Sequence, residues 1–329
     1  MSHPILDCID IHAHGFPERY LRAIAARYPD KVQLAEETGR DLIARWTGAP
    51  LPAWNADVRV REMARDGVAI EILSAPTIYA WLDEDTRGFC AELNDFQASM
   101  ARDRPDKFRS FLHLPVHEPD AAIRELDRWR NRSEVAGVVF GSNMGGIYPG
   151  DAKLLPIWDA IRALDLPVFV HPVTPAACFG PVVSPIVLFP CDTTLAATSI
   201  IYAGIFDKFP GIRIILSHYG GALPFLAARL DMAVDIPGFP PRHGQDLRDR
   251  PSQYVRHFYF DTAQGFHRAA FECACTVVGL EHILYGSDQF FVGSTWRARL
   301  NGFLGELNLS PNQLSAIVRG NAQRTFRCF

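Results

Sequence analysis

The chain has 329 residues, 48% of them hydrophobic, so it can bury a large core and exceeds the usual size of one domain unless the fold is a large one. Its formal net charge of -4 argues against a general nucleic-acid-binding protein. No apolar run reaches the roughly 18 residues of a membrane span, and the N-terminal MSHPILDCID lacks the features of a signal peptide. We therefore expect a soluble, cytoplasmic protein with neither nucleic-acid nor membrane partners. Its seven cysteines, without a CxxC pair, are expected to be free thiols.

Apolar, strand-like runs alternate with longer amphipathic segments from residue 5 to residue 287, which is the pattern of a parallel sheet with crossover helices. The eight predicted strands are 5–12, 68–73, 108–114, 135–140, 167–171, 212–217, 256–261 and 282–286. The predicted helices are 57–66, 84–103, 119–131, 153–165, 193–208, 221–235, 266–279, 295–307 and 311–319.

Eight strands with helices between them predict an α/β protein with a (β/α)8 TIM barrel, formed by residues 1–329 as one domain. A doubly wound open sheet is the alternative, but no GxGxxG follows the first strand. Residues 29–56 are expected to form a small inserted cap. Residues 172–192 hold five prolines and are predicted to be a long loop on the active face; 236–252 is the expected mobile or interface loop.

The first strand delivers two histidines, His12 and His14, at its C-terminal end. Residues i and i+2 of a strand project to the same side, so both imidazoles can point into one cavity. Imidazole nitrogens are good ligands for zinc, manganese or iron. Two ordinary histidines are the alternative, but their position, where the strand stops before Gly15, favours a metal site.

Other polar residues fall at the ends of later strands. His171 ends the fifth strand, His218 ends the sixth, and Asp288 follows the eighth. The C-terminal ends of barrel strands form the active face, so we expect these residues to meet the first histidine pair there. The remaining histidines lie at strand starts, in loops or in helices and receive no role: 3, 113, 117, 243, 257, 267 and 282.

These residues belong to motifs that together cover nearly the whole chain. The motifs are Asp10-Ile-His-Ala-His14, Asp57-Val-Arg-Val-Arg-Glu-Met-Ala64, Val170-His-Pro172, Phe209-Pro-Gly-Ile-Arg-Ile-Ile-Leu-Ser-His-Tyr-Gly-Gly-Ala-Leu-Pro-Phe225, Tyr285-Gly-Ser-Asp288 and Gly320-Asn-Ala322. With them the sequence resembles the amidohydrolase superfamily, within the group of aminocarboxymuconate-semialdehyde decarboxylase and the γ-resorcylate and 6-methylsalicylate decarboxylases.

The resemblance implies that His12, His14, His171 and Asp288 hold one divalent metal ion. It also implies that His218 stays off the metal and acts with Asp288 as a catalytic residue. No lysine that could bridge a second metal ends the fourth strand. Three imidazoles favour zinc, with manganese as the alternative.

Substrate contacts follow from the same resemblance. Arg229 stands where γ-resorcylate-type enzymes carry a substrate-contacting arginine, and a guanidinium there could bind a carboxylate; a surface salt bridge is the alternative. An apolar pocket for one ring could include the aromatic residues that follow, although each of them could equally be plain core. They are Trp54, Trp81, Tyr219, Phe290 and Phe291.

The chain also departs from its relatives. No arginine stands between Trp46 and Arg59, where the semialdehyde decarboxylase binds a second carboxylate. His12 and Gly221 stand where the γ-resorcylate enzymes carry two glutamates. The stretches Phe189-Pro-Cys-Asp-Thr-Thr194 and Ser217-His-Tyr-Gly-Gly-Ala-Leu-Pro-Phe225 most resemble the 6-methylsalicylate type.

We predict a metal-dependent, non-oxidative decarboxylase of a hydroxylated aromatic or conjugated carboxylic acid, and the resemblance implies a homodimer. A hydrolase or hydratase of the same superfamily, acting on a lactone, amide or double bond, is the first alternative. A non-catalytic barrel used for binding is the second.

Overall fold

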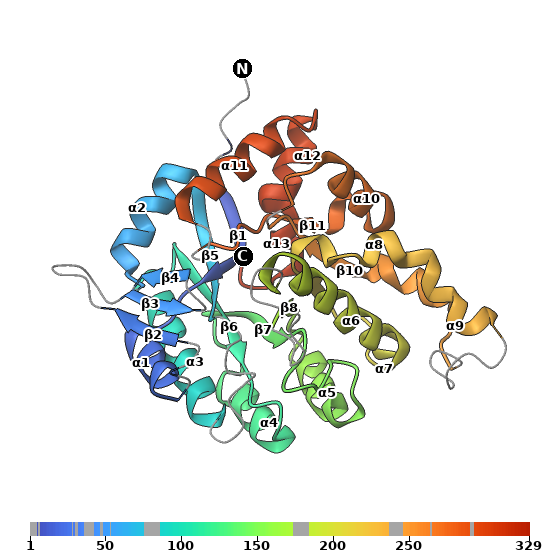
Figure 1. Cartoon of the computed structure of the whole chain (residues 1–329), viewed down its shortest axis with the longest axis horizontal. Coiled ribbons are helices and arrows are strands. Elements are labelled where there is room, and N and C mark those ends of the chain that lie inside the picture. The colour runs from blue at the N-terminus through green and yellow to red at the C-terminus, as the bar shows by residue number, and fades with distance from the viewer. Residues whose placement is uncertain are drawn as a thin grey trace.

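Eight parallel strands form the centre of the computed structural model, and helices surround them (Figure 1). The structure describes residues 5, 7–27, 29, 32–35, 43–46, 49–52, 54–75, 86–173, 184–236, 246–263, 265–289 and 293–329. In spatial order the strands are β1 (Cys8–His14), β5 (Val68–Ser74), β6 (Phe108–His113), β7 (Val135–Gly141), β8 (Val168–His171), β9 (Ile214–Leu216), β10 (Phe258–Asp261) and β11 (Ile283–Leu284). The predicted (β/α)8 barrel is confirmed.

The barrel closes where the first strand meets the segment that contains and follows the last one. The backbone N–H of Ile11 donates to the carbonyl of Tyr285 (3.0 Å), and that of Asp288 donates to the carbonyl of His12 (2.9 Å). His14 N–H donates to Gln289 at 2.7 Å. This closure brings His12 and His14, the first candidate ligands in the sequence, next to Asp288, the last one.

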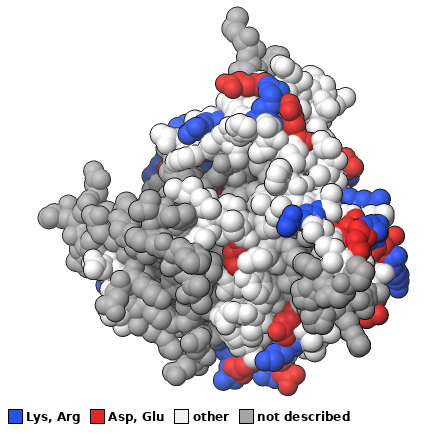
Figure 2. Space-filling view, turned by 45° about the vertical axis from the view of Figure 1, so that its right-hand side comes forward, with Lys and Arg blue, Asp and Glu red and all other residues white. Residues whose placement is uncertain are grey.

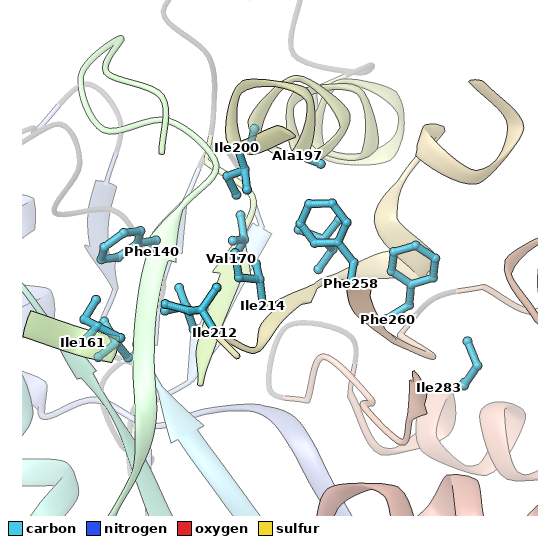
Figure 3. Packing of buried hydrophobic residues seen from close by; sticks show 14 of the residues in the cluster. Phe140, Ile161, Val170, Ala197, Ile200, Ile212, Ile214, Phe258, Phe260 and Ile283 are labelled. Carbon is cyan, nitrogen blue, oxygen red and sulfur yellow. The ribbon is translucent and has the colours of Figure 1, made fainter. Parts of the chain in front are cut away.

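Apolar side chains fill both faces of the barrel wall. Those inside the barrel are Ile9, Ile11, Ile72, Phe111, Val139, Phe169, Ile215 and Leu284, and Phe326 from the C-terminus packs against them. Figure 3 shows part of the outer layer, where Val170, Ile214 and Phe258 lie beneath Ala197 and Ile200 of α6. Strand residues alternate between the two layers, as at Phe169 and Val170, and this explains why these strands read as continuous hydrophobic runs.

Most of the predicted helices are present. The larger ones are α2 (Ala56–Asp66), α3 (Thr86–Asp103), α4 (Pro119–Arg128), α5 (Leu155–Ala163), α6 (Phe189–Tyr202), α10 (Arg268–Val278) and α11 (Gly293–Gly305). Shorter helical segments are η2 (Ala152–Leu154), α7 (Ile205–Lys208), η6 (Pro251–His257), η7 (Leu280–His282), α12 (Pro311–Ser315), η8 (Ala316–Gly320) and α13 (Asn321–Thr325). No helix was predicted over α1 (Glu18–Arg27).

Two predicted segments differ from the structure. The prediction of a loop over 172–192 is wrong for its last part, because η3 (Ser184–Leu188) and the start of α6 are helical. Pro190 stands in the first turn of α6, where its missing N–H costs no hydrogen bond. The single helix predicted over 221–235 is instead a chain of short pieces, namely α8 (Leu223–Leu226), η5 (Ala227–Asp231) and α9 (Met232–Asp235), and η4 (His218–Gly220) precedes them.

A small antiparallel sheet lies within the segment expected to be a cap. It consists of β2 (Val32–Ala35), β3 (Ile43–Trp46) and β4 (Ala49–Pro52), and it lies beside α1 (Figure 1). Its role as a cap stays a prediction. In the part of the chain that the structure describes, no helix has the length and apolarity to cross a membrane.

Candidate metal and active site

Four buried side chains converge at the C-terminal end of the barrel. His12 and His14 come from β1, His171 from the end of β8 and Asp288 from the turn after β11. Their ligand atoms all lie within 4.8 Å of one another. The imidazole centroids of His12, His14 and His171 are 4.9 to 5.2 Å apart, and the rings stand nearly edge to face. The structure thus brings together the four residues expected to hold a metal.

Each imidazole is oriented by a contact on its Nδ1 atom. His12 Nδ1 lies 2.7 Å from Asp261 Oδ2, and His14 Nδ1 lies 3.2 Å from the hydroxyl of Ser74. His171 Nδ1 lies 3.0 Å from the carbonyl oxygen of Pro172. In this arrangement Nε2 is the atom that each ring would present to a metal, which is how second contacts fix histidine ligands.

The electrostatics of the group favour a cation. Burial alone would lower the pKa of His12, but the carboxylates of Asp288 and Asp261 outweigh burial and raise that pKa to about 10. Burial would raise the pKa of Asp288, yet His12 and the other imidazoles hold it well below its usual range. Burial lowers the pKa of both His14 and His171, so those rings are neutral, the form that binds metals. A positive charge at this point is therefore stabilised.

The donor set fits a single divalent ion. His12 Nε2 is buried and makes no hydrogen bond to another described residue, although Asp288 Oδ1 lies 3.2 Å away. Three imidazoles and one carboxylate are donors that zinc and manganese both accept. The strand that would carry a bridging lysine, β7, ends at Phe140 and Gly141. These residues provide for one ion.

His218 stands beside this group. Its Nε2 lies 3.4 Å from Asp288 Oδ2, and its ring centroid is 5.4 Å from that of His12. The backbone from His218 to Gly221 has positive φ throughout, a conformation that costs free energy for His218 and Tyr219. Asp261 Oδ1 helps to hold the turn by accepting the His218 N–H at 2.7 Å. The geometry places an imidazole within hydrogen-bonding distance of the Asp288 carboxylate.

Asp261 is a site residue that was not predicted from the sequence. It is fully buried at the end of β10, where one carboxylate oxygen contacts His12 and the other accepts the backbone N–H groups of His218 and Ala263. The available signal was the same one that identified His171, namely a polar residue at the C-terminal end of an apolar strand, here Phe258-Tyr-Phe-Asp261.

The placement of His113 also differs from the prediction, which put it away from strand ends. It is the last residue of β6 and fully buried, and its Nε2 accepts the N–H of Ala75 at 3.0 Å. Burial lowers the pKa of His113 to about 3, and the neighbouring His14 imidazole acts in the same direction. It is a neutral structural histidine next to the site.

The predicted substrate residues are less closely grouped. Trp54 is partly buried and lies beside Gly15, directly after the ligand strand β1, where it packs against Phe96 and Phe108. Arg229 is exposed on η5, and its role in substrate binding stays a prediction. Tyr219 belongs to the core, packed against Phe271 of α10. Trp81, Phe290 and Phe291 lie outside the described residues.

The sequence profile of the amidohydrolase family matches residues 9–328. The chain belongs to the amidohydrolase family. Among curated proteins it is 28% identical over 291 residues to γ-resorcylate decarboxylase of Polaromonas sp., covering 82% of this chain and 87% of that protein. It is 26% identical over 291 residues to 6-methylsalicylic acid decarboxylase of Penicillium expansum, covering 85% of this chain and 84% of that protein.

Solved structures share this amidohydrolase's fold. One is the dihydroxybenzoic acid decarboxylase of Polaromonas sp., crystallised with manganese and the inhibitor 2-nitroresorcinol; it has a TM-score of 0.80 and 24% sequence identity, covering 97% of this chain and 96% of that one. The predicted family resemblance is confirmed by these relatives, which are decarboxylases of hydroxylated aromatic acids.

Proposed function

We propose that this amidohydrolase is a metal-dependent, non-oxidative decarboxylase of a hydroxylated aromatic carboxylic acid. The observation that carries the proposal is the buried group His12, His14, His171 and Asp288 with His218 beside it, at the end of the barrel where such enzymes act. The curated relatives, which cover most of the chain, support the choice of reaction.

The residues of the site divide the work. When bound, the divalent ion would polarise a phenolate or carboxylate oxygen of the substrate. His218 and Asp288, 3.4 Å apart, form a relay that brings a proton to the ring carbon bearing the carboxyl group. As that carbon gains the proton, the bond to the carboxyl carbon breaks, its electron pair stays with the ring carbon, and carbon dioxide leaves. Arg229 is proposed to bind the substrate carboxylate, and Trp54, Phe290 and Phe291 to contact its ring.

We propose zinc as the metal because three imidazoles suit it, and manganese is the alternative that a structural relative holds. Elemental analysis of the purified protein, followed by reconstitution of the chelated protein with each metal, distinguishes them. Near-stoichiometric zinc with zinc-restored activity supports the proposal, whereas activity with manganese alone rejects zinc.

The reaction is tested with a panel of acids. The protein is incubated with 2,6-dihydroxybenzoate, 6-methylsalicylate and related acids, and release of carbon dioxide or bicarbonate is measured against a metal-chelated control. Parallel incubations with lactones and amides, followed by acid release, cover the alternative of a hydrolase. Turnover only in the second set would overturn the proposed reaction while keeping the metal site.

We also propose a homodimer that covers exposed apolar side chains on η3, α6 and α8. Phe225 is 83% exposed and Ile186 is 73% exposed, and Val187 and Leu195 are exposed as well. In Figure 2 most blue and red side chains lie toward the top, the right and the bottom of the face, and the described surface between them is mostly uncharged. A monomeric mass at micromolar concentration in analytical ultracentrifugation would contradict the dimer.

A cytoplasmic location is the remaining proposal. The six cysteines among the described residues form no disulfide, and this suits a reducing compartment. Fractionation of the source cells would test it, and recovery outside the cytoplasm would reject it.

A further inference from the structure

Asp10 lies behind the metal site, on the outer side of the barrel wall, and is fully buried. Each of its carboxylate oxygens accepts two hydrogen bonds. Oδ1 accepts the backbone N–H groups of His12 (3.1 Å) and Ser287 (3.0 Å). Oδ2 accepts the hydroxyl of Ser287 (2.5 Å) and Nη2 of Arg297 on α11 (2.9 Å). One carboxylate thus joins β1 to the turn that carries Asp288.

The first contact falls where β1 departs from regular alternation. Ile9 and Ile11 pack inside the barrel, and strict alternation would turn His12 outward. Instead the His12 ring lies 4.9 Å from the ring of Phe169 in the interior cluster, and the pairing of β1 with β5 shifts register between Asp10 and Ala13. Such irregularities re-aim side chains next to active sites. Asp10 satisfies the His12 N–H at this point.

The second contact fixes the turn Gly286-Ser287-Asp288. Asp288 has a φ of 58°, which is uncommon for a residue with a side chain. Gly286 allows the close approach, because a Cβ there would lie 2.9 Å from the Cβ atoms of His12 and Asp261. Asp10 is therefore hydrogen-bonded both to β1 and to the turn after β11, the two segments between which the barrel closes.

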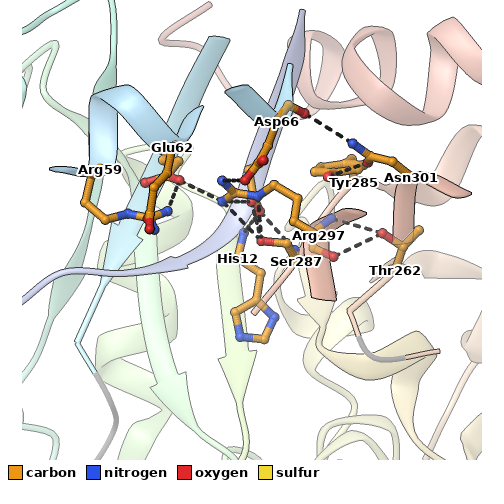
Figure 4. Close-up of polar contacts among 12 residues, drawn as sticks. His12, Arg59, Glu62, Asp66, Thr262, Tyr285, Ser287, Arg297 and Asn301 are labelled. Carbon is orange, nitrogen blue, oxygen red and sulfur yellow. Dashed lines mark hydrogen bonds and ion pairs between the residues drawn. The ribbon is translucent and has the colours of Figure 1, made fainter. Parts of the chain in front are cut away.

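Arg297 provides the compensating charge. Its side chain is fully buried and also contacts Glu71 at 2.7 Å. Figure 4 shows Arg297 and Ser287 together, with the His12 ring pointing away from them toward the metal site. The charged group and the ligand ring thus lie on opposite sides of β1.

We infer that Asp10, held by Arg297, is a positioning residue that sets the geometry of the metal site through its hydrogen bonds to the His12 amide and to Ser287. This inference rests on the proposed metal site and assigns a role to residues that would not touch the metal. Second contacts of metal ligands typically change metal affinity by about 10- to 100-fold.

The test compares Asp10→Asn and Ser287→Ala with Glu71→Gln. Glu71 is a matched control because it is equally buried and binds the same Arg297, but none of its described side-chain contacts is to a residue of the metal site. Metal-free proteins are titrated with zinc or cobalt, and their unfolding midpoints are measured without metal. Ser287→Ala should weaken metal binding by about tenfold and Asp10→Asn by about 10- to 100-fold, whereas Glu71→Gln should stay within about threefold of the unmodified protein.

At saturating cobalt, the visible absorption bands should shift in Asp10→Asn and Ser287→Ala but not in Glu71→Gln. Equal weakening in Asp10→Asn and Glu71→Gln would overturn the inference, as would unchanged affinity in both Asp10→Asn and Ser287→Ala. If Asp10→Asn does not fold, the milder Ser287→Ala decides. Failure of the unmodified protein to bind any metal would instead refute the proposed function.

Discussion

Replacing Asp261 by asparagine should weaken metal binding while leaving the barrel folded. The amide oxygen of asparagine can still accept the backbone N–H groups of His218 and Ala263, which now lie 2.7 and 3.0 Å from Oδ1. The amide NH2 would then face His12 Nδ1, now 2.7 Å from Oδ2, and it cannot accept a hydrogen bond from that nitrogen. His12 would be driven to the tautomer that carries its proton on Nε2, the metal-binding atom.

The loss amounts to one charge-assisted hydrogen bond, roughly 1.5 to 3 kcal/mol, or about 10- to 100-fold in metal affinity. Titration of chelated protein with zinc in competition with an indicator dye measures it. Asp231→Asn is the control, because Asp231 also accepts a backbone N–H, that of Ser252 at 2.8 Å, but lies on η5. If Asp261→Asn binds metal within about threefold of the unmodified protein, Asp261 does not orient His12.

Three further predictions concern single histidines and one arginine. His218→Ala should keep its metal but lose about two to four orders of magnitude in kcat, whereas His12→Ala should lose the metal; a metal-free His218→Ala protein would make His218 a ligand. Arg229→Met should lower kcat/KM by about 10- to 100-fold with the metal retained. An unchanged kcat/KM would mean that Arg229 does not bind the substrate. The pKa of His113 is about 3 in the folded protein and roughly 6.5 in an unfolded chain. The contribution of His113 to the free energy of unfolding is therefore fully present above pH 6.5 and is lost toward pH 3, by up to about 1.4 kcal/mol per pH unit. His113→Gln should show a shallower loss in acid denaturation, and an identical acid profile would contradict this.

Much of the fold was predictable because its signals are local. Each barrel strand is an apolar run between polar segments, so eight runs could be counted and their C-terminal ends assigned to one face. That rule placed His12, His14, His171, His218 and Asp288 on this face, and the family resemblance implied which four of them hold the metal. Helix boundaries were less predictable around Pro190, since proline ends a helix in its interior but is tolerated in its first turn.

The residues that support the ligands were decided only by the tertiary structure. Asp261 lies 249 residues from His12, and Asp10 lies 277 residues from Ser287. No sequence pattern indicates which residue an aspartate within or at the end of an apolar strand will hydrogen-bond. Its partner depends on which strands closure of the barrel brings together, and on the register irregularity in β1 that turns His12 inward. The sequence by itself determined which side chains could bind a metal, and the closed barrel decided which others hold them in place, because hydrogen bonds across the seam exist only once the first and last strands meet.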